Sequence, residues 1–215
     1  MKRSIIALMA VLGLFALACG FLDPDDAREA LTVTYHEDFD VGPLNIDADE
    51  VCPPDADCSE DSAPSPTDVE LMPVEFNIDI DIVDAMGNED LRDISSRLRT
   101  LEITSIDYQV ADNDLTFDLP DLDIFVAPIG TEDSEDSAAI HLTTIPSTSA
   151  GEDASGNAPV IEANRHASSE LFKTLEFTAL PTAQPMVKEG QPFPPSGSAE
   201  VTLTINLKLT ANPTD

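Results

Sequence analysis

Two stretches of strict alternation decide the fold class of this chain, 74-VEFNIDIDI-82 and 201-VTLTINLKLT-210. In the first, every second residue from Val74 to Ile82 is apolar, and the residues between them are Glu, Asn or Asp. In the second, every second residue from Val201 to Leu209 is apolar and the others are polar. Because successive side chains of a β-strand point to opposite faces, both stretches predict strands with one buried and one solvated face.

Shorter segments of the same kind lie between and before these two. Apolar or alternating residues predict further strands at 31–35, 100–110, 115–119, 122–126, 139–145 and 174–180. Within 100–110 the apolar positions change phase between Ile103 and Ile106, which predicts a β-bulge near Thr104 and Ser105. The run Asp112-Asn113-Asp114 predicts a hairpin turn that returns through 115–119.

The remaining segments predict helices and loops. Leu91, Ile94 and Leu98 recur at helical spacing after Asn88, a good N-cap residue, so we expect a short helix over 89–98 and another turn or two near 166–175. Acidic or proline-containing loops are expected at 42–67, 130–137, 147–157 and 181–198. Together these elements predict a mainly β fold, an antiparallel β-sandwich (immunoglobulin-like or similar) with one or two short helices and long acidic loops. The strand order within the sheets stays open.

Residues 1–18 have the pattern of a secretory signal peptide. Lys2 and Arg3 form a cationic head, and residues 5–18 are apolar or glycine. This run is shorter than the roughly 20 residues that a membrane-spanning helix needs. A removable signal is therefore favoured over a permanent anchor.

The junction Ala16-Leu17-Ala18-Cys19-Gly20 resembles the lipobox of bacterial lipoproteins, in which small or aliphatic residues precede a cysteine. The resemblance implies that the signal is cut before Cys19 and that lipid on Cys19 holds the chain on a membrane of the bacterial envelope. It favours the outer membrane, because Gly20 is not the Asp that resembles an inner-membrane retention signal. The alternative is an ordinary Ala-x-Ala signal, cut after Ala18, which would release a soluble protein.

The chain divides into four parts on this interpretation. They are a signal peptide at 1–18, a lipid-anchored tether at 19–30, a strand with an acidic, cysteine-containing loop at 31–67, and the main β-sandwich at 68–215. The part from Asp68 onward is of ordinary one-domain size, so we expect 31–67 to belong to the same domain.

The chain is very acidic, with 42 Asp and Glu against 10 Lys and Arg and a formal net charge of −32. All the acidic residues lie beyond Cys19, and removal of Lys2 and Arg3 with the signal makes the remainder more negative still. Such a field repels phosphate backbones and anionic headgroups, which argues against nucleic acid and against peripheral binding to anionic lipid. It favours cations or basic partners.

With Cys19 lipidated, Cys52 and Cys58 remain as a pair in an oxidising compartment. The five residues between them form a loop that a disulfide can close, and we expect that disulfide. A zinc site is the alternative, but two thiols without nearby histidines supply only half of a tetrahedral shell.

Clustered carboxylates suggest a hard cation such as calcium, which prefers carboxylate and carbonyl oxygens. The candidate ligands are Asp47, Asp49, Asp55, Asp57, Glu60 and Asp61 around the cysteine pair, His36, Asp38 and Asp40 on one strand face, and Asp79 and Asp81 on another. The alternative, which we favour, is that these residues are the solvated faces of strands and acidic loops. No other cofactor is expected, because glycine-rich phosphate-binding motifs are absent.

No catalytic residue can be assigned from the sequence. Gly-x-Ser-x-Gly is absent, and His36, His141 and His166 each have an ordinary position on a strand or near a helix. We therefore expect a non-catalytic, lipid-anchored module of the cell envelope, structural or binding a protein partner through loops at the ends of the sandwich. The candidate binding loops are 52–58, 130–137, 147–157 and 181–198. The alternatives are a calcium-dependent binding or adhesion domain and a secreted hydrolase or ligand carrier. The oligomeric state stays open.

Overall fold

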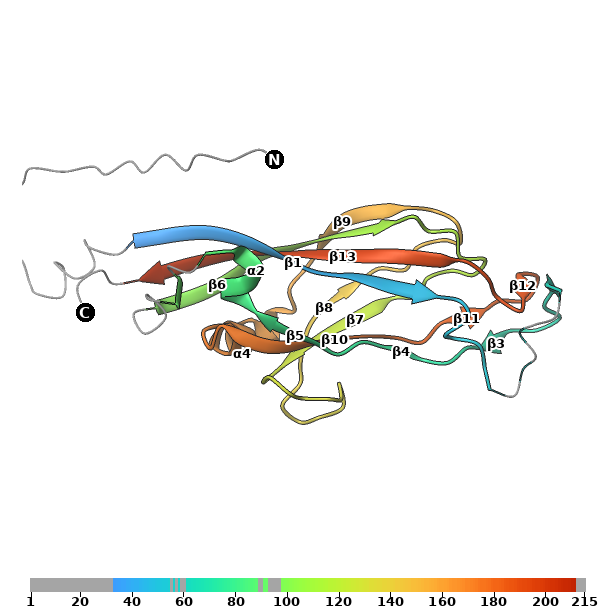
Figure 1. The fold of residues 1–215 in the computed structure, drawn as a ribbon, viewed down its shortest axis with the longest axis horizontal. Helices are drawn as coiled ribbons and strands as arrows, with labels where there is room; N and C mark the ends of the chain where they lie inside the picture. Colours follow the sequence, from blue (N-terminus) through green and yellow to red (C-terminus); the bar gives the residue numbers. More distant parts are fainter. Residues whose placement is uncertain are drawn as a thin grey trace, which may run out of the picture.

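The computed structural model describes residues 33–211 except 55, 57, 59, 60, 89, 90 and 93–97. Its main strands are β1 (Val33–Asp47), β4 (Val74–Glu75), β5 (Ile78–Asp81), β6 (Leu98–Ala111), β7 (Leu122–Ala127), β8 (Ile140–Ile145), β9 (Ala154–Ala158), β10 (Glu176–Ala183) and β13 (Ser198–Ala211). They form two antiparallel sheets that lie face to face, one in the order β1-β13-β6-β9 and one in the order β4-β10-β7-β8, with β5 also paired to β10 (Figure 1). The predicted mainly β sandwich is confirmed.

The strand order is that of a jelly roll. β4 and β5 are two parts of one line of chain along β10, so each sheet has four such lines. Counted along the sequence, the lines run one-eight-three-six in the first sheet and two-seven-four-five in the second. Neighbours in each sheet are therefore mostly distant in sequence, which is why alternation alone left the order open.

The proline Pro181 explains why β4 and β5 are separate strands. Their pairing with β10 keeps one register throughout, with Glu75 opposite Thr182 and Ile78 opposite Ala179. Between these pairs, the N–H of Phe76 donates to the carbonyl of Pro181 at 3.0 Å. Pro181 has no N–H to return the bond, so the ladder is interrupted there. The prediction that a loop begins at Pro181 is wrong.

β13 lies inside the first sheet and follows the predicted alternation, with Val201, Leu203, Ile205, Leu207 and Leu209 all buried. Its pairing with β6 shifts where Asn206 lies opposite Ser105 but Leu207 lies opposite Ile103, so Thr104 is an extra residue. The predicted bulge is confirmed. Because of it, apolar side chains on both sides of the phase change face the core.

The prediction that the first strand gives way to a loop beyond Val41 is wrong. β1 continues to Asp47, and its pairing with β13 shifts between Val41 and Leu44. Gly42, with φ of 113°, and Pro43 form the irregularity. β1 is an edge strand, and edge strands tolerate a proline at a bulge because pairing can resume beyond it.

The predicted hairpin at 112–114 is also wrong, because β6 and β7 belong to different sheets. Residues 112–121 instead cross from one sheet to the other. Leu115, Phe117 and Leu119 are buried on the way. Their alternation reflects burial between the sheets, without a strand ladder.

The loop predicted at 147–157 contains the edge strand β9, which pairs with β6. Its sequence, Ala-Ser-Gly-Asn-Ala, has no large apolar residue and so gave no alternation signal. At Gly156 a β-carbon would lie only 3.0 Å from the ring of Tyr108, so the β6 aromatic side chain fills the space that a side chain on β9 would need.

Two short α-helices lie among the described residues, α2 (Ile82–Met86) and α4 (Arg165–Phe172), with the 3-10 turn η2 (Glu162–Asn164) before α4. Asp81 ends the predicted strand early, because its carboxylate accepts the N–H groups of Val83 and Asp84 at 2.8 and 3.2 Å and so caps α2. Most of the helix predicted at 89–98 lies outside the described residues, although Leu91 and Arg92 are helical. Neither α-helix is long and apolar enough to cross a bilayer.

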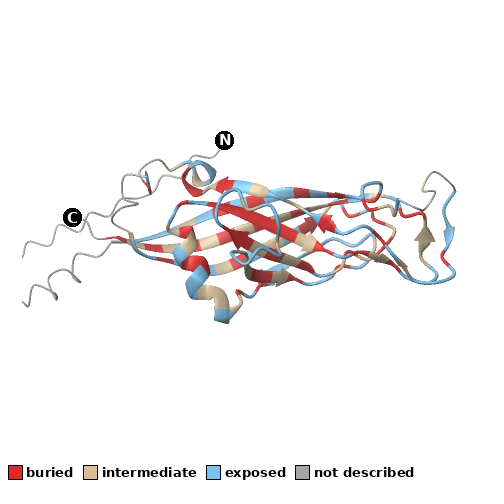
Figure 2. Ribbon diagram, turned by 90° about the horizontal axis from the view of Figure 1, so that it is seen from below, coloured by how far each residue is buried: buried red, intermediate tan, exposed pale blue. Residues whose placement is uncertain are grey.

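The core lies between the sheets and is mainly Val, Ile and Leu, as Figure 2 shows by the buried segments along the strands. Aromatic packing is concentrated in one cluster. Phe177 of β10 stacks on Phe172 of α4 with ring centroids 4.3 Å apart and meets Phe39 of β1 edge-on at 6.2 Å. This cluster joins both sheets and α4.

The two ends of the sandwich differ. At the terminal end, Val33 pairs with Ala211, so the described chain enters and leaves at the same place (Figure 1). At the opposite end, called the loop end here, four connections meet: 48–73, 112–121, 146–153 and 184–197. Short strands join the first and last of them, β2 (Ala63–Pro64) to β12 (Pro192–Phe193) and β3 (Val69–Glu70) to β11 (Met186–Val187).

Candidate functional site

The loop end brings together three of the four loops that the sequence suggested for binding. It contains 52–58, residues 147–153 of the predicted loop 147–157, and residues 184–197 of the predicted loop 181–198. The fourth, 130–137, lies elsewhere, where the side-chain amide of Asn77 donates to the carbonyl of Thr131 at 2.9 Å. The candidate surface is therefore the loop end.

Backbone hydrogen bonds fix these loops to one another. Ser65 N–H donates to Gln191 O at 2.8 Å, which joins 48–73 to 184–197. Asp114 N–H donates to Ser198 O and Thr116 N–H to Ser196 O, both at 2.9 Å, which joins 112–121 to the same region. These hydrogen bonds join segments that are far apart in the sequence. The loop end is therefore a surface of defined structure.

The carboxylate of Asp118 connects three of the four segments of the loop end. Its Oδ1 accepts the N–H of Ala150 at 3.2 Å and the side-chain amide of Gln191 at 3.3 Å. Its Oδ2 accepts the ammonium group of Lys188. Residues 112–121, 146–153 and 184–197 therefore meet at this side chain.

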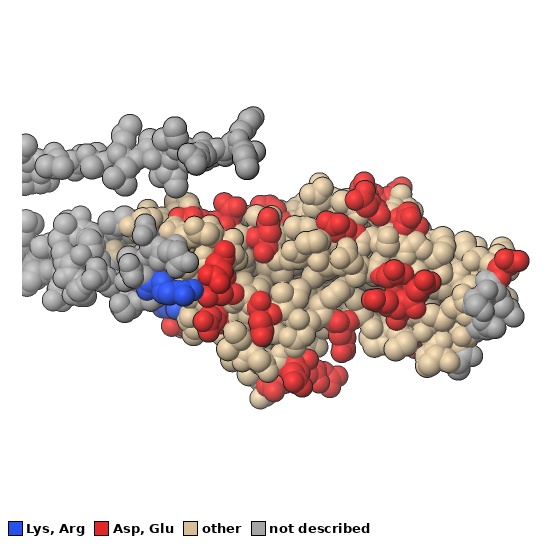
Figure 3. Space-filling model, viewed as in Figure 1, with Lys and Arg blue, Asp and Glu red and all other residues tan. Residues whose placement is uncertain are grey.

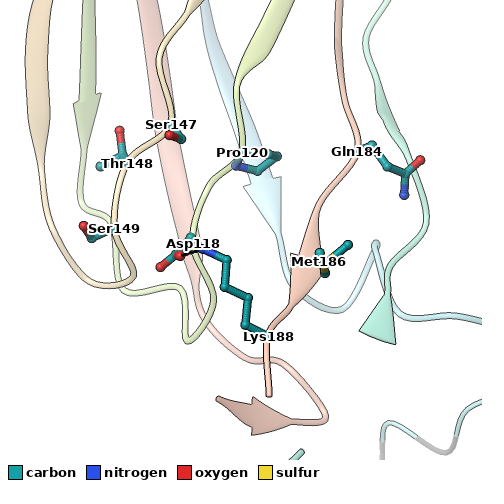
Figure 4. Close-up of a pocket in the computed structure, with 8 residues that line it drawn as sticks. All are labelled: Asp118, Pro120, Ser147, Thr148, Ser149, Gln184, Met186 and Lys188. Carbon is teal, nitrogen blue, oxygen red and sulfur yellow. Dashed lines mark hydrogen bonds and ion pairs between the residues drawn. The ribbon is translucent and has the colours of Figure 1, made fainter. Parts of the chain in front are cut away.

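A cavity of about 190 Å³ opens beside this carboxylate. Figure 4 shows Lys188 reaching across it toward Asp118. The lining residues are Asp118, Pro120, Ser147, Thr148, Ser149, Gln184, Met186 and Lys188. Pockets for drug-sized ligands have volumes of about 300–1,000 Å³, so this cavity suits a smaller group.

The sequence did not single out Asp118 or Lys188. Asp118 is one of 42 acidic residues, and nothing local distinguishes it. Lys188 did carry a signal, because it is the only basic residue between Lys173 and Lys208. A single cation in a loop of so acidic a chain is expected to lie near some carboxylate, but the sequence does not say which one.

The Lys188 hydrogen bond, aided by the N–H of Ala150, holds the pKa of Asp118 below its ordinary value of 3.8, despite partial burial. Because the folded pKa is the lower one, the ionised carboxylate stabilises the fold above about pH 4, and this contribution is lost as the pH falls through the folded pKa. We expect the stability difference between the wild type and Asp118→Asn to shrink between about pH 6 and about pH 2 in urea unfolding. Glu75→Gln, at an exposed carboxylate, controls for the loss of one charge. A difference that is equal at both pH values would contradict the assignment.

The strand candidates for a metal site are where the sequence expected them, on exposed strand faces. His36, Asp38 and Asp40 share the exposed face of β1, opposite Lys208, Asn206 and Thr204 of β13. Asp40 accepts the hydroxyl of Thr204 at 2.7 Å. A lysine beside this group of side chains opposes cation binding.

Most of the other candidates hold the fold together through hydrogen bonds or lie outside the described residues. Asp79 accepts the hydroxyl of Thr178 at 2.6 Å, Asp81 caps α2 and pairs with Arg92 at 2.9 Å, and Asp47 accepts the N–H of Asp49 at 2.9 Å. Asp55, Asp57 and Glu60 lie outside the described residues. Within the described part of the chain, no three His, Cys, Asp or Glu residues gather in a way that could hold a metal ion.

The two loop cysteines are joined. Cys52 and Cys58 form a disulfide, with Cα atoms 6.4 Å apart. This bond closes the small loop at the beginning of segment 48–73 and uses both thiols that a zinc site would need. Cys19 lies outside the described residues.

His141 has an acid and a hydroxyl nearby, but their arrangement is not that of a catalytic triad. Nε2 of His141 lies 3.1 Å from Asp123 Oδ1 and 3.2 Å from the hydroxyl of Thr144. That hydroxyl donates to Asp123 at 2.6 Å. A triad needs the acid and the nucleophile on different ring nitrogens, so that the histidine can take the hydroxyl proton. Here the carboxylate takes that hydrogen bond, and the imidazole stacks on Phe125.

His166 lines an open groove of about 410 Å³ beside α4, together with Ser169, Glu102 and Glu162. Ser169 is itself buried. Among the hydrogen bonds of the described residues, none joins His166 to a serine or to a carboxylate. The groove therefore has the residue types of a hydrolase site without their alignment.

Acidic side chains form separate patches along the whole length of the sandwich in the face drawn in Figure 3. In that face, basic side chains gather only beside the terminal end. Lys188 is the one lysine or arginine within the four segments of the loop end. The loop end therefore presents a negative field around a single internal ion pair.

No protein-family model and no curated protein sequence matches the chain. Solved structures with some likeness include one of Desmodium yellow mottle tymovirus, at 9% identity and a TM-score of 0.32, over 94% of this chain and 96% of that chain. A structure of the empty head of turnip yellow mosaic virus has 8% identity and a TM-score of 0.30, over 100% and 93% of the two chains. The T=3 Penaeus vannamei nodavirus has 8% identity and a TM-score of 0.26, over 98% and 62%. Scores this low support no conclusion about activity, partners or assembly.

Proposed function

We propose that this chain is an exported bacterial lipoprotein, held on the outer membrane by lipid on Cys19, and that its jelly roll is a non-catalytic module that binds a protein partner of the cell envelope. The anchoring part rests on the resemblance of residues 16–20 to a lipobox. The binding part rests on the hydrogen-bonded loops that form the loop end.

One structural observation makes the two parts compatible with each other. The described chain begins at Val33, at the terminal end, and β1 runs from there to the loop end. A lipid at Cys19 would therefore join the sandwich at the terminal end and leave the four connected loops at the far end from the attachment point. Binding residues are commonly placed on loops that a rigid scaffold holds in position, which fits this geometry.

The non-catalytic role is supported by the described histidines. His36 is exposed on β1, His141 shares one ring nitrogen with an acid and a hydroxyl, and His166 lacks a hydrogen-bonded nucleophile. General-base chemistry needs a base within hydrogen-bond reach of the group that it deprotonates and a carboxylate that orients it. These side chains do not provide that geometry.

Anchoring is tested by replacing Cys19 with alanine in the full-length gene expressed in a Gram-negative host. We expect the wild type to fractionate with membranes and its N-terminal peptide to carry acyl chains in mass spectrometry. The variant should lose both properties, because the thioether attachment atom is gone. Cys52→Ala with Cys58→Ala removes the two disulfide-bonded cysteines from the loop end and should leave fractionation unchanged. Equal membrane association of the Cys19 variant and the wild type would reject the anchor.

The orientation is tested separately by site-specific photo-cross-linking in intact cells. A cross-linking residue placed at Thr67, exposed at the loop end, is expected to capture a discrete envelope protein, whereas one at Thr34, exposed at the terminal end, is not. Capture of the same protein from both positions, or only from Thr34, would contradict a partner at the loop end.

A further inference from the structure

The cavity beside Asp118 combines one carboxylate with apolar and hydroxyl walls. Pro120 and Met186 supply the apolar part, and Ser147 and Ser149 supply hydroxyl groups. In Figure 4 the side chain of Lys188 enters from one side and ends at Asp118. Walls of this kind suit a lysine or arginine side chain. Its methylene groups favour apolar contact, and its cationic group favours an anion and hydroxyl acceptors.

The two oxygens of Asp118 are used differently. Oδ1 accepts two hydrogen bonds from groups that belong to the framework of the loops, Ala150 N–H and the Gln191 side chain. Oδ2 accepts Lys188. If the ammonium group of Lys188 moves away, Oδ1 still holds the loops together and Oδ2 becomes free for another cation.

Lys188 can make that movement with its side chain alone. Its N–H donates to the side-chain oxygen of Gln191 at 2.7 Å, and its carbonyl accepts the N–H of Gln191 at 3.0 Å, so the backbone is fixed. The side chain is 61% exposed. Ion pairs as exposed as this contribute little to stability, so exchange of one cation for another at Oδ2 costs little.

The volume of the cavity selects the size of the group that enters. The space of about 190 Å³ lies below the roughly 300–1,000 Å³ of pockets for drug-sized ligands. That is enough for one long side chain and too little for a nucleotide or another cofactor of ordinary size.

The surrounding charge favours a cation from outside. Asp68 accepts the N–H of Glu189 at 2.8 Å, Asp121 accepts the N–H of Ser147 at 2.7 Å, and both lie next to the segments that line the cavity. The chain as a whole has a formal charge of −32. This negative field therefore attracts the basic residues of an approaching partner.

We propose that this cavity receives one lysine or arginine side chain of a protein partner, whose cationic group replaces the ammonium of Lys188 on Oδ2 of Asp118. The inference rests on the proposed binding function of the loop end and specifies its chemistry. Lys188 acts as an internal occupant that keeps the carboxylate paired until the partner arrives.

The test uses the full-length protein purified in detergent and the probe Nα-acetyl-lysine methylamide, with binding followed through amide chemical shifts of residues 146–153 and 188–191. The wild type is expected to bind weakly, with a Kd in the millimolar range, and Lys188→Met to bind about two- to fivefold more tightly, because an exposed internal competitor worth up to about 1 kcal/mol is gone. Lys208→Met makes the same change of charge at the terminal end and should leave the Kd as in the wild type. The uncharged probe Nα-acetyl-norleucine methylamide should bind to none of them.

Two further variants separate loss of the site from loss of the fold. Asp118→Asn should abolish probe binding, and Met186→Trp, which fills the cavity but keeps the carboxylate, should abolish it too while circular dichroism stays that of the wild type. The inference is overturned if Lys188→Met binds no more tightly than Lys208→Met, or if the filled cavity still binds the probe.

The outcome is independent of the anchor. If the protein binds the probe but the Cys19→Ala experiment shows no lipid anchor, the cation site stands and the lipoprotein assignment is rejected. If the protein is acylated but does not bind the probe, the anchor stands and the cation site is rejected.

Discussion

Phe177→Ala is expected to lower the free energy of unfolding by about 3–5 kcal/mol, the range for truncating a large buried aromatic side chain. Phe177 is fully buried on β10, stacks on Phe172 at 4.3 Å and meets Phe39 at 6.2 Å. Those partners belong to α4 and β1, so the truncation would leave a void where both sheets and a helix meet. Since a domain is typically stable by only about 5–15 kcal/mol, such a loss would bring the variant close to unfolding.

The matched control for Phe177→Ala is Tyr35→Ala, which also truncates an aromatic side chain on a strand. Tyr35 is 38% exposed, and surface substitutions usually change stability by about 0.5 kcal/mol or less. Urea unfolding followed by circular dichroism measures both differences. Similar losses for the two variants would mean that the aromatic cluster does not hold the sheets together as described.

Gly197→Ala is expected to destabilise the loop end by about 3 kcal/mol, as the sum of an unfavourable positive φ and a steric clash. Gly197 has φ of 93°, and a β-carbon there would lie 2.2 Å from the carbonyl oxygen of Asp114. A β-carbon and a carbonyl oxygen that are not bonded to each other cannot approach so closely. Segment 184–197 would therefore have to move away from 112–121. The hydrogen bond from Ala48 N–H to Gly197 O, at 3.0 Å, would be strained at the same time.

Gly190→Ala separates the two causes. Gly190 has a similar φ of 88°, but nothing lies within 4 Å of its added β-carbon. Its alanine variant should therefore lose only about 1–2 kcal/mol, the cost of the left-handed backbone. Hydrogen exchange of the loop-end amides and urea unfolding would measure the difference. Equal losses at the two glycines would show that the close approach to Asp114 is absent.

Local pattern predicted well wherever one strand face is buried by its own sheet. The alternation of residues 201–210 gave β13, and the phase change between Ile103 and Ile106 gave the bulge at Thr104. The alternation at 74–82 gave the correct buried face, although Asp81 and Pro181 limited the strands. In each case the burial pattern is written in consecutive residues, because side-chain direction repeats every two residues.

Local pattern failed wherever a distant segment decided the outcome. The residues Ala154–Ala158 form a strand because their backbone pairs with β6, although they have no large apolar side chain of their own. Segment 115–119 alternates like a strand but crosses between the sheets. Pro181 and Pro43 are loop signals in the sequence. In the structure each strand continues past its proline, because residues on both sides of the proline pair with a neighbouring strand.

The candidate site shows the same division. From the sequence, four loops were expected to bind, at 52–58, 130–137, 147–157 and 181–198. Most residues of all but 130–137 do meet at the loop end. The pair that organises this surface, Asp118 and Lys188, is separated by 70 positions and lies in loops without a motif. Acidic residues are so numerous that none could be selected from composition alone.

The sequence by itself determined the fold class, the buried faces of the long strands, the bulge in β6, the acidity of the surface and the expectation of an exported, lipid-carrying chain. Only the tertiary structure decided the jelly-roll order, the strand β9, the grouping of four loops at one end and the cavity beside Asp118. The physical reason is range. Side-chain direction, turn chemistry and charge are properties of neighbouring residues, whereas strand partners and cavities depend on which distant segments can bury their surfaces against each other at the lowest cost in chain entropy.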